Sequence, residues 1–178
     1  SPGVQADLAR QFQKHLTFLV DHGYVSPAGS LTADGRWAAR LRMDQPLIIA
    51  EGLRSGIFFN RTPAIMAGLV AAFMNEKESD DAVSEWELES GLIEAMSDAV
   101  RILRPFVDAL RSCDFDARSV YLRPAVAICR WAQEGSWEEA CECASMAEGD
   151  LAMLILRTAD CLRHLRGLKD VFPSVSMT

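Results

Sequence analysis

Apolar side chains recur every three or four residues along most of this chain, which is the spacing of a helix with one buried face. Each helical residue turns the chain by about 100°, so such positions line up on one side. The pattern predicts helices over residues 4–21, 33–41, 47–53, 63–73, 86–110, 124–134, 136–143 and 148–168. Short apolar pieces at residues 24–25 and 30–32 flank a Ser-Pro-Ala-Gly turn and predict a hairpin. The expected fold is therefore all-α, a helical bundle with a small β-hairpin near the N-terminus.

Residues that cap helices stand at several predicted boundaries. Thr32, and Thr62 followed by a proline, are suited to begin helices. Ser136 and Glu139, three residues apart, have the form of a capping box. Pro105 lies inside the predicted helix over 86–110 and leaves two alternatives open, a kinked helix or a split one.

The last long helix, residues 148–168, has two different faces. One face carries mainly apolar residues, namely Leu151, Leu154, Ile155, Thr158, Leu162 and Leu165. The opposite face carries Met153, Arg157, Asp160 and His164. We expect the first face to enter a core to which Trp131 and Trp137 also contribute. The second face keeps a cation and an anion one turn apart, on a surface open to solvent or to a ligand.

Length and composition are those of one domain taken from a longer protein. The chain has 178 residues, 49% of them hydrophobic, and begins Ser-Pro-Gly without an initiator methionine, so we expect residues 1–178 to be a single domain of a larger polypeptide. No apolar run approaches the ~18 residues of a membrane span, and no signal peptide is recognisable, so no membrane partner is expected. Five cysteines, an odd number on mostly helical sequence, favour reduced thiols and a cytoplasmic location.

The formal net charge of −7 changes what the chain is expected to bind. An acidic protein does not usually hold nucleic acid by bulk charge. Any such binding would need a local basic patch or the help of neighbouring domains.

Motifs for catalysis are absent from the sequence. It contains neither G-x-x-x-x-G-K-[ST] nor G-x-G-x-x-G, so this chain is not expected to hydrolyse a nucleotide by those means. Cys141 and Cys143 fall on different faces of one helix and are expected to be structural thiols rather than metal ligands. His15 and His22 are expected to be ordinary surface or helix-end histidines. We therefore expect no catalytic residue, metal or cofactor in this chain.

The pattern of a short helix, a turn and a long helix over residues 136–168 leaves a winged-helix DNA-binding module open. Such a module needs basic or amide side chains where its second helix begins, whereas this chain has Glu148 and Asp150, which would repel a phosphate backbone. Arg157 and Asp160, further along, have two interpretations. They form a surface ion pair contributing roughly a few tenths of a kcal/mol, or they contact single-stranded nucleic acid, by stacking on a base and accepting from a base edge.

Five segments occur in an order that resembles a known family. Residues 23–42 read GYVSPAGSLTADGRWAARLR, in which a Gly-Tyr turn leads to a threonine, a Gly-Arg pair and a helix of small residues. The segments LIIAEGLRSGIFFN at 47–60 and PAIMAGLVAAFMNE at 63–76 follow, and a Trp-to-Gly element at 131–135 precedes Glu-Gly-Asp-Leu at 148–151. Together they resemble the DSHCT domain, the C-terminal helical (ratchet) domain of superfamily 2 DExH-box RNA helicases, over roughly residues 10–170.

The resemblance implies a helical bundle that packs against the helicase motor domains of the same polypeptide and encloses single-stranded RNA or DNA. It implies that Arg157, Asp160 and Glu76 face the strand, and His164 shares their face of the helix and joins the expected nucleic-acid-binding set. ATP and Mg²⁺ would belong to the parent motor. Met153 stands where many members have an arginine, which reduces the charge of the channel. This departure, with differences in two loops, points to a bacterial relative of the family.

The expected function is that of a C-terminal accessory domain of an ATP-dependent helicase, which guides a single strand past the last long helix during unwinding. Two alternatives remain open. The first is a winged-helix-like DNA-binding module, to which residues 1–45 would contribute an edge. The second is a helical module that docks onto other proteins.

Overall fold

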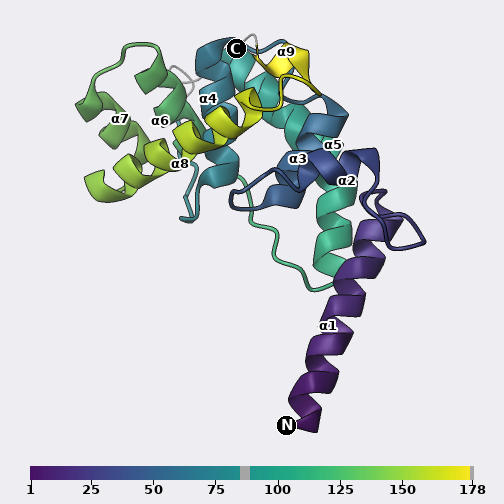
Figure 1. The fold of residues 1–178 in the computed structure, drawn as a ribbon. Helices are drawn as coiled ribbons and strands as arrows, with labels where there is room; N and C mark the ends of the chain where they lie inside the picture. The colour runs from purple at the N-terminus through teal and green to yellow at the C-terminus, as the bar shows by residue number, and fades with distance from the viewer. Residues whose placement is uncertain (85–88, 177–178) are drawn as a thin grey trace. The chain divides into compact units, whose positions relative to one another are not determined.

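The computed structural model describes residues 1–84 and 89–176, and the regular secondary structure of this part of the chain is helical (Figure 1). The predicted all-α class is confirmed. The chain divides into two compact units, Ser1–Arg42 (unit 1) and Met43–Thr178 (unit 2), which are described separately. That residues 1–178 act as one domain stays a prediction. None of the described helices is both long and apolar enough to cross a membrane.

Unit 1 contains two helices, α1 (Pro2–Asp21) and α2 (Ala33–Ala38). The apolar face predicted for α1 is largely open, because Leu8 and Phe12 are 64% and 69% exposed. The close approach of α2 to the preceding turn explains the Gly-Arg pair of the sequence. A Cβ at Gly35 would lie only 1.9 Å from the carbonyl oxygen of Tyr24, so no other residue fits there without displacing the backbone.

The predicted β-hairpin is wrong. Residues 24–32 form a closed turn with one isolated antiparallel bridge, between Val25 and Leu31, and the described residues contain no strand. Backbone hydrogen bonds of 2.7 and 3.1 Å close the turn. The ladder cannot lengthen, because α1 ends at Asp21 on one side and Thr32 already caps α2 on the other.

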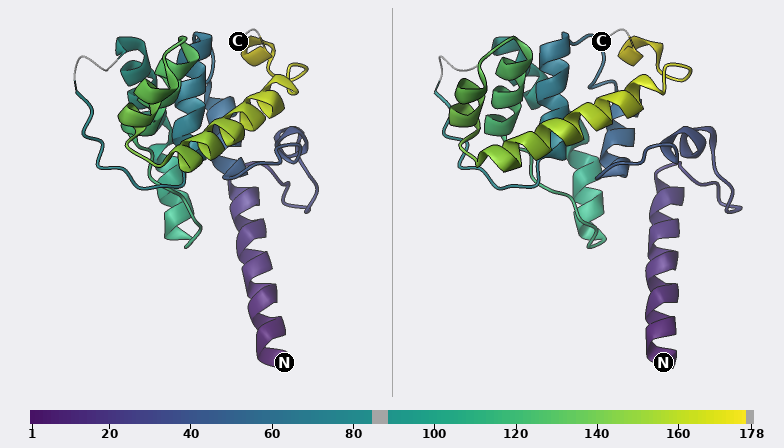
Figure 2. Two further views of the ribbon diagram at one scale, coloured as in Figure 1. Left: turned by 90° about the vertical axis from the view of Figure 1, so that its left-hand side faces the viewer. Right: turned by 60° about the vertical axis from the view of Figure 1, so that its left-hand side comes forward.

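Unit 2 holds the core that positions the candidate site. Its described helices are α3 (Pro46–Ser55), α4 (Pro63–Met74), α5 (Ser90–Ser112), α6 (Leu122–Ala132), α7 (Trp137–Ala144), α8 (Glu148–Arg166) and α9 (Pro173–Ser176). Residues 65–74 of α4 are all buried, and α4 contacts α5, α6 and α8. The views in Figure 2 show α8 running across the helices beneath it, and α8 also contacts α7 and α9.

A glycine allows the closest approach between α4 and α6. A Cβ at Gly68 would lie 2.7 Å from the carbonyl oxygen of Ala125 and 3.0 Å from the Cβ of Cys129. Real Cβ atoms do not approach a backbone oxygen that closely, so any larger residue would push the two helices apart. The small residue at this crossing therefore sets the distance between α4 and α6.

The predicted helix starts are confirmed by their caps. The hydroxyls of Thr32, Thr62 and Ser136 each accept a hydrogen bond from the N–H three residues on, at 3.0, 3.4 and 3.1 Å. The Glu139 carboxylate completes the capping box by accepting from the N–H of Ser136 at 3.3 Å. These local bonds satisfy N–H groups that a helix leaves without partners in its first turn.

The alternatives left open at Pro105 are resolved in part, because α5 continues through this residue as one helix and is not split. The predicted beginning of that helix, with Trp86 and Leu88, lies outside the described residues.

Arg118, in the connection between α5 and α6, binds the carbonyl groups at the C-terminal end of α4. Its guanidinium donates to the carbonyls of Phe73 at 3.0 Å and Asn75 at 3.2 Å, and it forms an ion pair with Asp44. Its backbone N–H donates to the side-chain oxygen of Gln45 at 3.1 Å. A cation at the C-terminal end of a helix also interacts favourably with the helix dipole. Arg118 thus joins the start of α3, the end of α4 and the α5–α6 connection.

Asp81, in the connection between α4 and α5, caps α6 from a distance. Its carboxylate accepts hydrogen bonds from the N–H groups of Leu122 at 2.9 Å and Arg123 at 3.0 Å, while the N-cap residue of α6 itself provides no side-chain bond. The guanidinium of Arg123 in turn donates to Asp80 at 3.1 Å. The N–H of Ala82 and then this guanidinium hold the pKa of Asp80 below its ordinary value.

Candidate nucleic-acid interface

One face of α8 enters the core of unit 2, as the sequence predicts. Its buried residues are Leu151, Leu154, Thr158, Cys161 and Leu165. Ile155 and Leu162, predicted on the same face, are half-buried at its edges. The hydroxyl of Thr158 donates to the carbonyl of Leu154 at 2.7 Å, so this buried polar group is satisfied within the helix.

The charges at the two ends of α8 suit its dipole. Glu148 and Asp150 lie in the first turn, and Arg163, His164 and Arg166 lie in the last turn. Carboxylates near a helix N-terminus and cations near a C-terminus are stabilising. The acidic start of α8, which argues against major-groove reading of duplex DNA, therefore has a structural reason.

Three of the four predicted binding residues lie on the side of α8 that faces away from the core. The side chains of Arg157, Asp160 and His164 are 37%, 54% and 28% exposed. The apolar residue one turn earlier, Met153, is 47% exposed. The face predicted from periodicity is thus open to solvent.

The fourth residue, Glu76, is brought to this face by the way the chain leaves α4. Asn75 is buried and extended, its amide donates to the carbonyl of Lys77 at 2.6 Å, and its oxygen accepts from the N–H of Lys77 at 3.3 Å. These bonds fix the direction of the chain between them. The exposed carboxylate of Glu76 is left 3.4 Å from the guanidinium of Arg157.

The four predicted residues form two pairs, and neither is the Arg157–Asp160 ion pair that the spacing along the helix suggested. Arg157 pairs with Glu76, and Asp160 lies beside His164, with 3.8 Å between carboxylate oxygen and ring nitrogen Nδ1. The same nitrogen lies 2.9 Å from the backbone carbonyl of Asp160. In the described part of the chain no ion pair joins Arg157 to Asp160, so that interpretation of their spacing is wrong. The carboxylate that Arg157 meets comes from another element.

The Arg157–Glu76 pair is not strongly held. Both partners of the Arg157–Glu76 pair are more than a third exposed. Exposed ion pairs contribute at most about 1 kcal/mol and are screened by salt. A ligand that offers Arg157 a phosphate or a base could therefore displace Glu76 at little cost.

Sequence reasoning missed neighbours of this face. Lys77 lies 3.8 Å from Asp150 and adds a second link between the α4–α5 connection and α8. Leu156 is 59% exposed, although periodicity placed it on neither face. Lys77 could have been found from its position directly after Glu76. Nothing in the sequence marks Leu156.

Two tryptophans were expected in the core, and this expectation is wrong. Trp131 is 40% exposed, and Trp137 is half-buried. The buried part of α6 covers residues 124–129, so Trp131 comes after it on the last turn of that helix. Trp137 is the first residue of the short helix α7.

Two cysteines, Cys141 and Cys143, lie on the short helix α7 that precedes α8. Cys143 is buried and Cys141 is half-buried. Desolvation, followed by the charges of Glu148 and Glu138, raises the pKa of the Cys141 thiol. Among the described residues there is no group of histidine, cysteine and carboxylate side chains that could hold a metal ion.

Comparison with known proteins identifies the family. The DSHCT (NUC185) domain family matches residues 28–178. The chain is 35% identical over 77 residues to a probable helicase, HelY, of Mycobacterium leprae (strain TN), which covers 42% of this chain and 8% of that relative. The same figures hold for the protein of that name from Mycobacterium tuberculosis (strain ATCC 25618 / H37Rv).

A plant relative aligns over more of the chain. This is the DExH-box ATP-dependent RNA helicase DExH9 of Arabidopsis thaliana, 25% identical over 146 residues, which cover 80% of this chain and 15% of that relative. The chain therefore spans less than a sixth of the length of these relatives. Since the family match covers most of its residues, the chain belongs to the DSHCT domain family.

Proposed function

We propose that this chain is the C-terminal accessory domain of an ATP-dependent DExH-box helicase, and that the outer face of α8 guides single-stranded nucleic acid during unwinding. We call this surface the Arg157 face; it consists of Glu76, Arg157, Asp160 and His164. The observation that carries the proposal is that Arg157 and Asp160 stay open to solvent while the opposite side of α8 is buried. Membership of the DSHCT family and relatives named as helicases support it.

Three residues of the Arg157 face have a distinct role in this proposal. The guanidinium of Arg157 stacks on a base or binds a phosphate. The carboxylate of Asp160 accepts a hydrogen bond from a base edge, and His164 lies beside it. Glu76 occupies Arg157 when no strand is present and contacts the bases when one is.

The motor would lie elsewhere in the longer polypeptide, where ATP and Mg²⁺ bind. The net charge of −7 limits what this chain can do alone. Affinity for nucleic acid comes largely from neutralising phosphates, and this chain has a surplus of carboxylates. We therefore expect the isolated chain to bind a single strand weakly, and the strand to be held mainly by the motor.

The test is the substitution Arg157→Ala in the full-length helicase, with Arg157→Lys beside it. We expect the alanine variant to lower single-strand affinity and the rate of unwinding about tenfold, since one stacked or charge-assisted contact is lost. The lysine variant keeps the charge but loses the planar group, so it separates phosphate binding from stacking. Binding is measured by fluorescence anisotropy on tailed RNA and DNA duplexes, and unwinding by strand displacement.

Arg101→Ala is the matched control, because Arg101 is also an exposed arginine paired with a carboxylate, that of Asp98 at 3.1 Å on α5. It should leave binding and unwinding unchanged. Equal affinity and unwinding for Arg157→Ala and the wild type would refute the assignment of this face. Glu76→Gln adds a second check: it strengthens binding if Glu76 only competes for Arg157, and weakens it if the carboxylate also contacts bases.

A further inference from the structure

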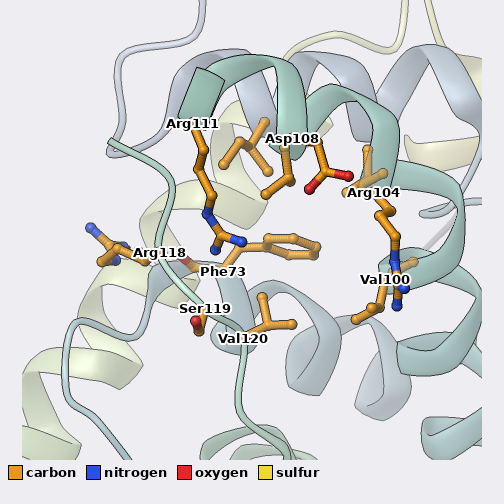
Figure 3. A pocket seen from close by; sticks show the side chains of 12 residues that line it. Phe73, Val100, Arg104, Asp108, Arg111, Arg118, Ser119 and Val120 are labelled. Carbon is orange, nitrogen blue, oxygen red and sulfur yellow. Dashed lines mark hydrogen bonds between the residues drawn. The ribbon is translucent and has the colours of Figure 1, made fainter. Parts of the chain in front are cut away.

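Unit 2 contains a pocket that the proposed function does not use. Its volume is about 500 Å³, within the range of ligand-binding pockets. It lies between the second half of α5 and the connection over residues 118–120, and its lining includes Phe73 of α4 and Ile48 of α3 (Figure 3). None of the residues of the Arg157 face lines it. We call it the α5 pocket.

The floor of the α5 pocket is apolar and fixed. Ile48, Phe73 and Leu103 are 4%, 5% and 3% exposed, so they belong to the core as well as to the pocket. Figure 3 shows the Phe73 ring, Val100 and Val120 pointing into the space. The hydrogen bonds of Arg118 to the end of α4 hold the connection that forms one wall. The pocket is thus preformed, and burying apolar side chains of a ligand in it would contribute favourably to the free energy of binding.

The mouth of the pocket is open and carries more positive than negative charge. Val100 at its edge is 39% exposed. The residues of α5 that line it include Arg104, Asp108 and Arg111. Two N–H groups of Arg111 donate hydrogen bonds to the carbonyl of Ala117. Arg104 and Asp108 have no ion-pair partner in the described residues. Three guanidiniums line the pocket, of which that of Arg118 is paired with Asp44, and one carboxylate does, although the chain as a whole has a charge of −7.

The spacing along α5 gives this edge a regular pattern. Val100, Arg104, Val107 and Arg111 recur at intervals of four, three and four residues, so they follow one face of the helix, with apolar and cationic groups in alternation. A complementary surface has large apolar side chains alternating with carboxylates. At so open a site a small molecule would leave much of its surface exposed to water. A protein segment could place apolar side chains on the floor of the pocket and cover its charged mouth as well.

We infer that the α5 pocket is a docking site for an acidic segment of another protein, which inserts one or more large apolar side chains over Phe73 and places carboxylates against Arg104 and Arg111. The assignment rests on charge complementarity and on the apolar floor. It is independent of the Arg157 face, so either can fail without the other.

The probe is a phage-displayed library of random peptides, selected on the 178-residue chain, with enriched peptides remeasured by fluorescence polarisation. We expect enriched peptides to combine acidic residues with leucine, phenylalanine or tryptophan. Arg104→Glu and Val100→Glu should weaken their binding about tenfold or more, by charge reversal and by a charge at the apolar mouth.

The matched controls lie on the same helix outside the pocket. Arg101→Glu makes the same charge change, and Ile102→Glu replaces an apolar residue that is 37% exposed, against 39% for Val100. Both should change the affinity less than twofold, and so should Arg157→Ala. Thermal unfolding of each variant checks that the fold is kept.

Five outcomes would overturn the inference, four of which concern the peptides. These are failure of any peptide to be enriched, enrichment of basic peptides, equal loss of affinity in the pocket variants and the controls, and displacement of the peptide by a single-stranded oligonucleotide. Self-association of the chain that Val100→Glu abolishes would likewise overturn it, by assigning the pocket to a second copy.

Discussion

Asp81 caps a helix that begins forty-one residues later in the chain. It holds a positive φ of 54°, which non-glycine residues seldom adopt, and thereby directs its carboxylate at the first N–H groups of α6. The bonds made by Asp81 do for α6 what Thr62 does for α4 and Ser136 for α7. The difference is that Thr62 and Ser136 are adjacent to the helices they cap and can be recognised in the sequence, while Asp81 is remote and cannot.

Cys161 makes the stability of the chain depend on pH in the alkaline range. Burial, with a smaller effect of the Asp160 charge, raises the pKa of this thiol from 9.0 to about 12. In the unfolded chain the thiol ionises near its ordinary pKa. The stability that the neutral thiol contributes is therefore complete below pH 9 and is lost as the pH rises from 9 toward 12.

We predict that Cys161→Ala removes the part of this dependence that comes from Cys161, while Cys129, whose pKa burial also raises to about 12, keeps its own part. The difference in unfolding free energy between the wild type and the variant should shrink by on the order of 2 kcal/mol between about pH 8 and about pH 10.5, as measured by urea unfolding. Leu165→Ala, a buried change without a titrating group on the same face of α8, should show a constant difference. A difference that does not shrink for Cys161→Ala would contradict the assigned pKa.

Among the elements, helices were predicted well where their signals are local. The caps at Thr32, Thr62 and Ser136 and the buried face of α8 all depend on residues within a few positions of one another. The prediction of a hairpin failed because the flanking helices leave no room for a longer ladder. A short apolar pattern in the sequence does not reveal this. The open face of α1 was missed because periodicity shows which side is apolar, but not whether anything covers it.

The crossing of α4 and α6 gives a prediction at this scale. Gly68→Ala should lower the free energy of unfolding by about 1–3 kcal/mol, because the added Cβ would lie 2.7 Å from the Ala125 carbonyl. Chemical denaturation of the 178-residue chain measures it.

Gly149→Ala is the control, since a Cβ there meets nothing within 4 Å in the first turn of α8. It should be neutral or stabilising by up to about 1 kcal/mol, because alanine favours the helix. Equal effects of the two substitutions would show that α4 and α6 do not approach as closely as described.

For the whole molecule, the division into two units predicts how the chain can be shortened. Unit 2 has its own buried core around α4, so residues 43–178 should fold alone and unfold in one cooperative transition. Circular dichroism and calorimetry of this fragment provide the measurement. A fragment that lacks a cooperative transition, or that melts more than about 10 °C below the full chain, would show that unit 1 is needed for the core.

The candidate site shows the limit of sequence reasoning at this largest scale. Periodicity alone placed Arg157, Asp160 and His164 on the open side of α8. The position of Glu76 came from the family resemblance, and its pairing with Arg157 was not foreseen. That contact joins a residue of α8 to one of the α4–α5 connection, and it depends on the buried Asn75, which has no sequence signature of its own.

The pairing of Arg157 with Glu76 has a kinetic consequence under the proposed function. An arginine without a carboxylate partner would bind each phosphate of a passing strand more tightly, because nothing would compete for its guanidinium. Such binding would slow the movement of the strand. Glu76 can take the guanidinium back as soon as a phosphate leaves, so neither the bound nor the vacated state is much lower in free energy. When the two states have similar free energies, the barrier to moving the strand past this surface is small. Under the proposed function, the rate of translocation would then be determined by the motor.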